Sequence, residues 1–236
     1  MENITKGAAV CKGVPAAGEM ALINAQALRE LKAEEVFTFR VAAADTQVDR
    51  DFEYFSKECL EKLAELYVGK TFIADHQWSS SNQVARVYAA AVETGEDGVS
   101  RLILRCYMLR SEATLPIIDA IEAGINREVS VGVAVQSAVC SICGADKAHS
   151  YCEHRPGKAY NGTVCTVELR DPTEAYEVSF VAVPAQREAG VVKRYAGDSE
   201  QPPEVPPEDT NAARRKLLAA KIALEKIKFI EEETSV

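Results

Sequence analysis

The chain has 236 residues, of which 47 % are apolar and 27 % are charged, as in a soluble globular protein with room for one sizeable domain. Its formal net charge of −9 argues against binding to nucleic acid or to an anionic membrane. No apolar stretch is long enough to span a bilayer, and the first residues lack a signal-peptide core, so we expect a protein that stays in a reducing cytoplasm.

The first 35 residues are weakly patterned, because glycines and a proline interrupt any long element. We expect an arm over residues 1–35 whose second half, around Ala21 to Leu31, is helical. The folded body is expected to span residues 36–195. It begins with a strand at 36–41, where apolar and polar residues alternate, and a polar turn with three aspartates follows at 45–51.

The rest of the body combines two helices with several strands. Apolar residues recur at helical spacing over residues 56–67 and stop at Gly69, which predicts an amphipathic helix. A second helix is expected between Pro116 and Gly124. The expected strands lie at residues 71–74, 84–92, 101–109, 128–135 and 177–183, with a hairpin turn at 95–98. Without a regular strand–helix repeat, this pattern predicts a mainly β, α+β fold that is barrel-like with flanking helices.

The composition changes near residue 196. Residues 197–210 contain four prolines and five acidic residues, which predicts a solvated, extended linker over 196–210. Good helix formers follow, with one apolar stripe of Leu217, Ala220, Leu224 and Ile227. Residues 211–236 are therefore expected to form an amphipathic tail helix that needs a partner surface.

The strand at residues 128–135 has two unequal faces. Four valines alternate from Val129 to Val135 and share one face. The other face carries only Glu128, Ser130, Gly132 and Ala134. This shallow row leaves room for something to lie against it, and Ser130 would meet that group with a hydroxyl. The alternative interpretation is that Ser130 is simply a small residue at a tight packing point.

A cysteine-rich segment interrupts the body at residues 140–165. Seven cysteines, an odd number, favour free thiols and a metal site over a disulfide framework. The spacing C-x2-C-x8-C-x-H supplies four tetrahedral ligands for a structural zinc ion, namely Cys140, Cys143, Cys152 and His154. Cys165 or His149 could replace one of them. Thiols placed by chance, or a catalytic metal, are the alternatives.

His76 is the one histidine outside this segment, and it directly follows an apolar strand. A serine hydroxyl needs such a base to remove its proton, and the base needs a partner that fixes its tautomer. Ser130 and His76 could fill the first two roles. Glu177 is the preferred third member, because a carboxylate on a buried strand is costly unless it is paired. Asp75, Asp171 and Glu174 are alternatives.

Three blocks around these residues resemble the tailed-phage prohead (head maturation) serine proteases, which are related in fold to the herpesvirus assemblin proteases. The blocks are GKTFIADH with the later Ala-Arg in residues 69–86, AGINREVSVG ending at Gly132, and EVSFVAVPA at residues 177–185. The resemblance covers roughly residues 36–190. It implies that His76 is the general base, Ser130 the nucleophile and Glu177 the acidic third member, where assemblins use a second histidine.

The same resemblance implies a serine endopeptidase of phage capsid maturation with no catalytic cofactor. Its substrates would be the phage scaffold, or the scaffold segment of the major capsid protein, and the protease itself. It would act inside the immature phage head in the cytoplasm of the bacterial host. The tail helix would dock on scaffold or capsid subunits, or support self-association. The cysteine-rich segment, the linker and the tail lie outside the family's common core.

Two rival functions remain open at the level of sequence. The first is a non-enzymatic, zinc-stabilised capsid-assembly or scaffold-like protein, in which Ser130 and His76 are relics of the fold. The second and weaker rival is a zinc-dependent hydrolase that uses the cysteine cluster.

Overall fold

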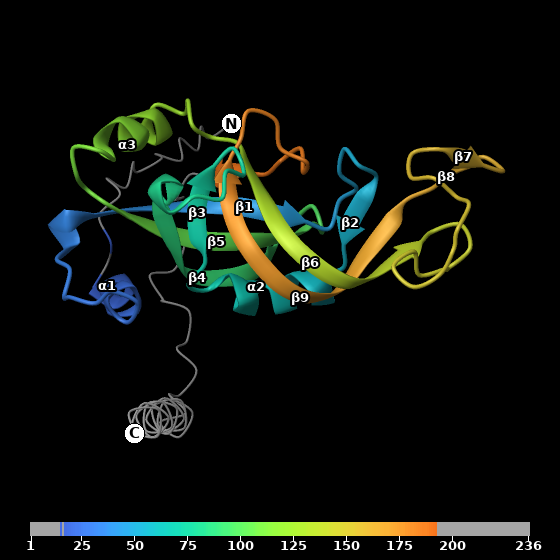
Figure 1. Ribbon diagram of the computed structural model, residues 1–236, viewed down its shortest axis with the longest axis horizontal. Coiled ribbons are helices and arrows are strands. Elements are labelled where there is room, and N and C mark those ends of the chain that lie inside the picture. Colours follow the sequence, from blue (N-terminus) through green and yellow to red (C-terminus); the bar gives the residue numbers. More distant parts are fainter. Residues whose placement is uncertain (1–14, 16, 193–236) are drawn as a thin grey trace, which may run out of the picture. The chain divides into compact units, whose positions relative to one another are not determined.

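The computed structural model describes residue 15 and residues 17–192. The expected linker at 196–210 and tail helix at 211–236 lie outside the described residues, as do residues 1–14 and 16 of the expected arm. Among the described residues, no helix is long and apolar enough to cross a membrane. The described elements in chain order (Figure 1) are α1 (Ala17–Asn24), η1 (Ala33–Glu35), β1 (Val36–Asp45), β2 (Glu53–Phe55), α2 (Lys57–Tyr67), β3 (Thr71–Ala74), η2 (Ser80–Asn82), β4 (Ala85–Thr94), β5 (Ser100–Leu109), α3 (Leu115–Glu122), β6 (Val129–Cys140), β7 (Ala159–Tyr160), β8 (Thr163–Val164), β9 (Val167–Phe180) and β10 (Gly190–Val192).

The main sheet has eight strands in the order β10-β1-β5-β4-β3-β9-β2, and β6 pairs with β9 beside this path. Strands β2 and β3 run parallel to β9, and the other pairs are antiparallel. One isolated bridge between Glu128 and Gly190 joins the start of β6 to β10, and no continuous ladder closes the described sheet. Over residues 17–192 the fold is therefore mainly β with three α-helices, of the expected α+β class, and its sheet is mixed and open.

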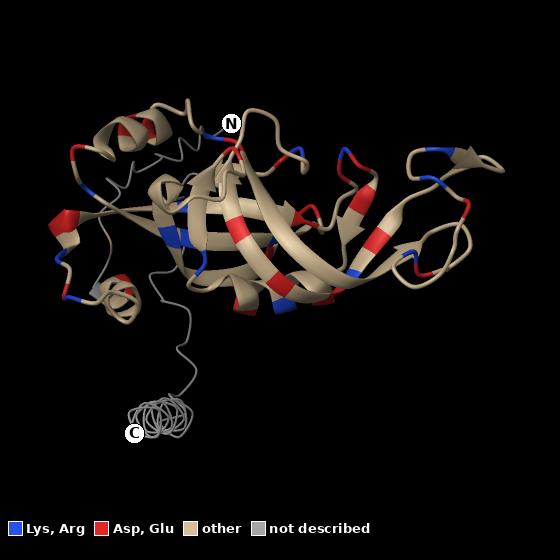
Figure 2. Cartoon of the chain, in the orientation of Figure 1, with Lys and Arg blue, Asp and Glu red and all other residues tan. Residues whose placement is uncertain are grey.

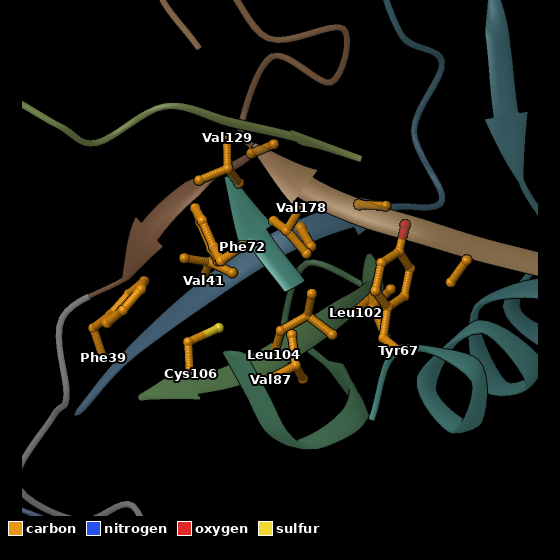
Figure 3. Close-up of a cluster of buried hydrophobic side chains, with 14 of the residues drawn as sticks. Phe39, Val41, Tyr67, Phe72, Val87, Leu102, Leu104, Cys106, Val129 and Val178 are labelled. Atoms are coloured by element: carbon orange, nitrogen blue, oxygen red, sulfur yellow. The ribbon is translucent and has the colours of Figure 1, made fainter. Parts of the chain in front are cut away.

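The core lies between the sheet and α2. Side chains of Phe39, Phe72 and Phe180 make stacked and edge contacts with ring centroids 4.5–6.1 Å apart. Leu63 and Tyr67 of α2 are fully buried in the same cluster, part of which is drawn in Figure 3. Burial of each such large side chain contributes about 1.5–3 kcal/mol. The predicted helix at 56–67 is confirmed as α2. The Ser56 hydroxyl caps its N-terminus by accepting a hydrogen bond from the Cys59 N–H.

Strands β6 and β9 form a long two-stranded ribbon that crosses the core and continues beyond it (Figure 1). The valine face of β6 packs inward, with Val129 paired to Phe180 and Val131 to Val178. The strand expected at 128–135 starts at Val129 and extends to Cys140. It is longer than expected because the fourteen-residue strand β9 pairs with it along its whole length.

The expectation of a strand at 177–183 is wrong at both ends, since β9 covers Val167–Phe180. Its early part was hidden because it is rich in charged residues, which depress β propensity. The chain turns away after Phe180, and Val183 is 68 % exposed rather than sharing a buried face with Glu177. Glu177 therefore lies inside the strand and does not open it.

The cysteine-rich segment sits at the far end of this ribbon, because it connects Cys140 to Val167 and these two residues are paired. It contains only the short β7–β8 hairpin as regular structure. The ring of Phe52 lies against Gly157, where a β-carbon would come within 2.6 Å of it. This contact ties the segment to the loop before β2.

Candidate functional site

The candidate site is built on the three adjacent strands β3, β9 and β6. Glu177 on β9 is paired with Thr71 on β3 and with Gly132 on β6. Strand β9 carries four acidic residues and β6 carries none (Figure 2), yet only Glu177 among those four is buried. Its side chain is 3 % exposed. A carboxylate in such a place is costly unless it has partners.

Glu177 has one partner and one unpaired oxygen. Its Oε1 lies 2.8 Å from Nδ1 of His76. The same oxygen lies over Gly132, where a β-carbon would be only 2.7 Å away. Its Oε2 is buried and has no hydrogen-bond partner among the described residues. The absence of a side chain on Gly132 therefore makes the space in which the carboxylate reaches the imidazole.

His76 is held by an unusual turn at the end of β3. Asp75 and His76 both adopt positive φ angles, of 54° and 51°. Such angles in non-glycine residues cost of order 1–3 kcal/mol each and persist only when neighbours enforce them. Here the Asn82 side-chain amide donates to the carbonyl oxygens of Ala74 and Gln77, at 2.8 and 3.0 Å. These bonds fix the turn that directs the imidazole back over β9.

The backbone of His76 is anchored separately. Its N–H donates to Oγ of Ser179 at 2.9 Å, and Ser179 is completely buried. The imidazole itself is 43 % exposed. Because Nδ1 donates to the carboxylate, the neutral ring keeps its lone pair on Nε2. The ring thus has one nitrogen held by Glu177 and a second nitrogen that has no hydrogen-bond partner among the described residues.

Ser130 lies on the same face of the sheet. It is paired across the ribbon with Ser179, which is itself paired with Ile73 on β3. Directly paired residues have α-carbons about 5 Å apart, so Ser130 is one strand away from the residue that anchors His76. Its side chain is half-buried and has no hydrogen bond to any described residue. The structure places His76 and Glu177 in contact and Ser130 beside them, with no Ser130–His76 hydrogen bond formed.

None of the three alternative acids forms a hydrogen bond or an ion pair with His76; its described partners are Ser179 and Glu177. Asp171 forms an ion pair with Lys62 at 2.8 Å. Glu174 and Asp75 are exposed. Neither Ser179 nor Asn82 was predicted from the sequence to have a role in the site. The position of Ser179, two residues after Glu177 on one face of a strand, was an available signal, whereas nothing in the sequence marked Asn82.

The predicted zinc ligands also come together. One ligand atom from each of Cys140, Cys143, Cys152 and His154 lies within 4.8 Å of every other, so the cluster could hold a metal ion. The sulfur atoms of Cys143 and Cys152 are 3.6 Å apart, and Cys152 Sγ is 3.5 Å from His154 Nδ1. Zinc–sulfur bonds of about 2.3 Å put tetrahedral sulfur ligands about 3.8 Å apart, so these separations suit such an ion.

The surroundings of the cluster favour a thiolate at Cys140. Burial opposes ionisation of Cys140, but backbone N–H groups of Cys143 and Ile142 lower its pKa to about 6. The Lys147 ammonium donates to the His154 carbonyl at 2.7 Å, and the Tyr160 ring stands edge-on to the His154 ring. Such outer contacts orient the ligands.

The two reserve ligands are placed differently. Cys165 is completely buried and its sulfur lies 3.8 Å from that of Cys140, yet it is outside the four-residue group. His149 is exposed on the turn after Asp146, to whose carbonyl its N–H donates. The geometry therefore favours the three cysteines and His154 as the primary set.

Comparison with protein-family models, with curated proteins and with solved structures found no match for this chain.

Proposed function

We propose that this chain is a serine endopeptidase of the prohead-protease type, with a barrel-like domain related to the assemblins. The observation that carries the proposal is the 2.8 Å contact between His76 Nδ1 and the buried Glu177 carboxylate, on the face that also bears Ser130. A nucleophile, a base and a group that orients the base are the three parts that acyl transfer requires. The resemblance of the three sequence blocks supplies the family.

The chemistry follows from these positions. Ser130 Oγ forms a bond to the scissile carbonyl carbon while its proton passes to His76 Nε2. The carbon–nitrogen bond then breaks, and the imidazolium returns the proton to the leaving amine. A water molecule repeats the sequence to release the acyl group. Glu177 accepts from Nδ1 throughout and stabilises the imidazolium that forms in each half-reaction.

Two features support a catalytic role for the His76–Glu177 pair over a structural one. The first is that Glu177 is buried with one oxygen unpaired, an arrangement that destabilises a fold and needs a reason. The second is the pair of consecutive positive φ angles at Asp75 and His76, since backbone strain of this kind clusters at active sites. A histidine needed only for packing would require neither.

The substrates and setting of the proposed activity come from the resemblance. They are the scaffold or the scaffold segment of the phage major capsid protein, and the protease itself, inside the immature head in the bacterial cytoplasm. The chain's tail, residues 211–236, would bring the enzyme into the shell by docking on those subunits or by self-association.

We also propose that the Cys140–His154 cluster binds one structural zinc ion. Its donors are three thiolates and one imidazole, the set typical of closed tetrahedral sites that leave no position for substrate. The bound ion would hold together a segment with almost no core of its own. It would also lock the end of the ribbon whose strands carry Ser130 and Glu177.

The test of the endopeptidase proposal is co-expression with the capsid protein of the same phage, followed by mass spectrometry of the capsid subunit. We expect shortened capsid protein with the unmodified chain, and full-length protein in assembled shells with Ser130→Ala. Ser137→Ala, on the same strand, is the matched control and should cleave normally. Full-length capsid protein in both cases would contradict the proposal and favour the non-enzymatic assembly protein, whereas equal cleavage in both cases would show that Ser130 is not the nucleophile.

A further inference from the structure

A recess of about 310 Å³ lies beside the His76–Glu177 pair. Its walls come from β3, from β9 and from the segment at residues 78–83, and its lining is mostly apolar. Ile73 and Glu177 line it, as do Trp78 and Tyr176. None of the described residues that line it belongs to β6. The recess is therefore on the β3 side of the site, away from Ser130.

An irregularity in β9 places Tyr176 at the recess. Gly132 pairs with Glu177 and Val133 pairs with Ala175, so Tyr176 is the extra residue of a β-bulge. Regular alternation would have put Tyr176 on the same inward face as Val178. The bulge instead buries Ala175 completely and leaves Tyr176 37 % exposed. Bulges beside active sites commonly redirect a side chain in this way.

The redirected ring meets the single tryptophan of the chain. The ring centroids of Tyr176 and Trp78 are 5.3 Å apart at an angle of 45°, and Trp78 is 69 % exposed. Large aromatic side chains that are left open to solvent around a concave apolar surface are typical of sites that bind a partner group. The pair forms one wall against which a flat or bulky side chain could pack.

The segment at residues 78–83, which includes Trp78, is held in place by hydrogen bonds. The Asn82 side chain holds the segment to the turn that carries His76, and the Val84 N–H donates to the Phe72 carbonyl at 2.9 Å. Ser79 and Ser81 hydroxyls hydrogen-bond each other at 2.8 Å. A recess held open by its own hydrogen bonds loses little conformational entropy when it is filled.

We propose that this recess is the substrate subsite for a large apolar side chain on the leaving-group side of the scissile bond. The inference rests on the proposed endopeptidase function. Because His76 Nε2 must protonate the leaving amine, the peptide segment that follows the scissile bond has to pass the imidazole. The recess lies on the side of Glu177 that faces β3 and His76, so this segment is the one whose side chain can enter it.

Charge at the recess selects against ionised side chains. A carboxylate would be repelled by Glu177, which lines the wall. An ammonium or guanidinium group would draw the same carboxylate away from the imidazolium that it must stabilise. A neutral aromatic or aliphatic side chain avoids both effects and covers the exposed faces of Trp78 and Tyr176.

The test is cleavage of a proteome-derived peptide library by the full-length protein, with both sides of each cleaved bond identified by mass spectrometry. We expect enrichment of Phe, Tyr, Trp or Leu at one fixed position after the cleaved bond. Trp78→Ala and Tyr176→Ala should each lower kcat/KM for a preferred peptide by about 10- to 100-fold relative to its alanine counterpart. Trp78→Phe should keep most of the preference, and Tyr151→Ala, an exposed tyrosine of the cysteine-rich segment, should change nothing.

Binding gives a second readout that needs no turnover. In Ser130→Ala, the fluorescence of Trp78 reports the recess alone, because the chain has no other tryptophan. Addition of the preferred peptide should shift the emission, and its alanine counterpart should not.

Failure of this inference can be told apart from failure of the proposed function. Cleavage without an apolar preference, or a preference that survives Trp78→Ala, would make the subsite wrong and leave the endopeptidase intact. A change of oligomeric state in Trp78→Ala with unchanged cleavage would show instead that the recess is a contact between copies. No cleavage of any peptide or capsid protein by the unmodified chain would remove both proposals.

Discussion

The carboxylate of Glu177 occupies the space that a side chain on Gly132 would fill. A β-carbon at Gly132 would stand 2.7 Å from Oε1, the same oxygen that lies 2.8 Å from the His76 ring. The Gly132 carbonyl oxygen is itself held in place, since the Tyr67 hydroxyl donates a hydrogen bond to it at 3.1 Å. Burial, with a smaller effect of the Glu177 charge, raises the pKa of Tyr67 well above its usual value and keeps this donor protonated. The glycine therefore cannot simply move aside.

This relationship predicts the effect of Gly132→Ala. The added methyl group should push Oε1 off Nδ1, and a displacement of about 1 Å in a catalytic group can cost about 100-fold in rate. We expect kcat/KM for peptide cleavage to fall by about 10- to 100-fold, while thermal unfolding changes little because the end of the Glu177 side chain can rotate. Gln136→Ala, an exposed change on the same strand, is the control. Unchanged kcat/KM in Gly132→Ala would show that the His76–Glu177 contact has no role in catalysis.

Much of this site could be predicted from sequence because it depends on strand periodicity. The small face of the strand around Ser130 and the histidine directly after a strand were both visible in the pattern of residues. The structure shows that the Glu177 carboxylate fills the space over Gly132 on this small face. Periodicity could not show this, because it predicts which face of a strand a residue lies on but not which strand pairs beside it.

Other features depend on tertiary context that one sequence does not display. The bulge at Tyr176 breaks the alternation of β9, so the pattern alone would place that ring in the core. The long charged start of β9 reads as a loop until its pairing with β6 is known. The turn at Asp75 and His76 contains no glycine, so the sequence does not indicate its positive φ angles. Spacing was sufficient for the cysteine cluster, because its ligands lie close together along the chain.

Glu177→Gln should separate activity from stability. The buried carboxylate has one unpaired oxygen, so replacing it with a neutral amide of the same shape removes a desolvation cost as well as a hydrogen bond to a charged acceptor. We expect a melting temperature equal to or above that of the unmodified chain. Activity should fall by about 1,000- to 10,000-fold, as when an orienting carboxylate in a triad becomes an amide. A large loss of stability in calorimetry, matched by a proportional loss of activity, would mark Glu177 as a structural residue.

Ser179→Ala should act on His76 through its backbone. The change removes the acceptor that binds the His76 N–H at 2.9 Å, and a lost hydrogen bond that leaves a buried donor unpaired costs about 1–3 kcal/mol. We expect the strained turn to relax, so that kcat falls by about tenfold with little change in KM. A merely structural role would lower the melting temperature and leave kcat, measured below that temperature, unchanged. Ser137→Ala provides the matched serine control.

The metal content of purified variants tests the ligand set. We expect about one zinc ion for each unmodified chain, from elemental analysis after purification without chelator. Cys143→Ser should lose the metal, whereas Cys165→Ser and His149→Ala should retain it, because neither belongs to the four-residue group. Retention by Cys143→Ser together with loss by Cys165→Ser would mean that the sulfur 3.8 Å from Cys140 is the true ligand.

Chelation then distinguishes a structural ion from a catalytic one. The cluster lies at the end of the β6–β9 ribbon, and Ser130 is ten residues along β6 from Cys140, paired within the main sheet. Removal of zinc should therefore lower the melting temperature and expose the cysteine-rich segment to proteolysis, since metal binding and folding are coupled there. Peptide cleavage measured below the lowered melting temperature should persist at more than about half its rate. The pairing of Ser130 with Ser179 and the hydrogen bond from the His76 N–H to Ser179 lie within the main sheet, so they should persist when the segment loosens. Abolition of cleavage by chelator in a protein that remains folded would instead place the chemistry at the cysteine cluster, as expected of a zinc-dependent hydrolase, and Ser130→Ala would then cleave at the normal rate.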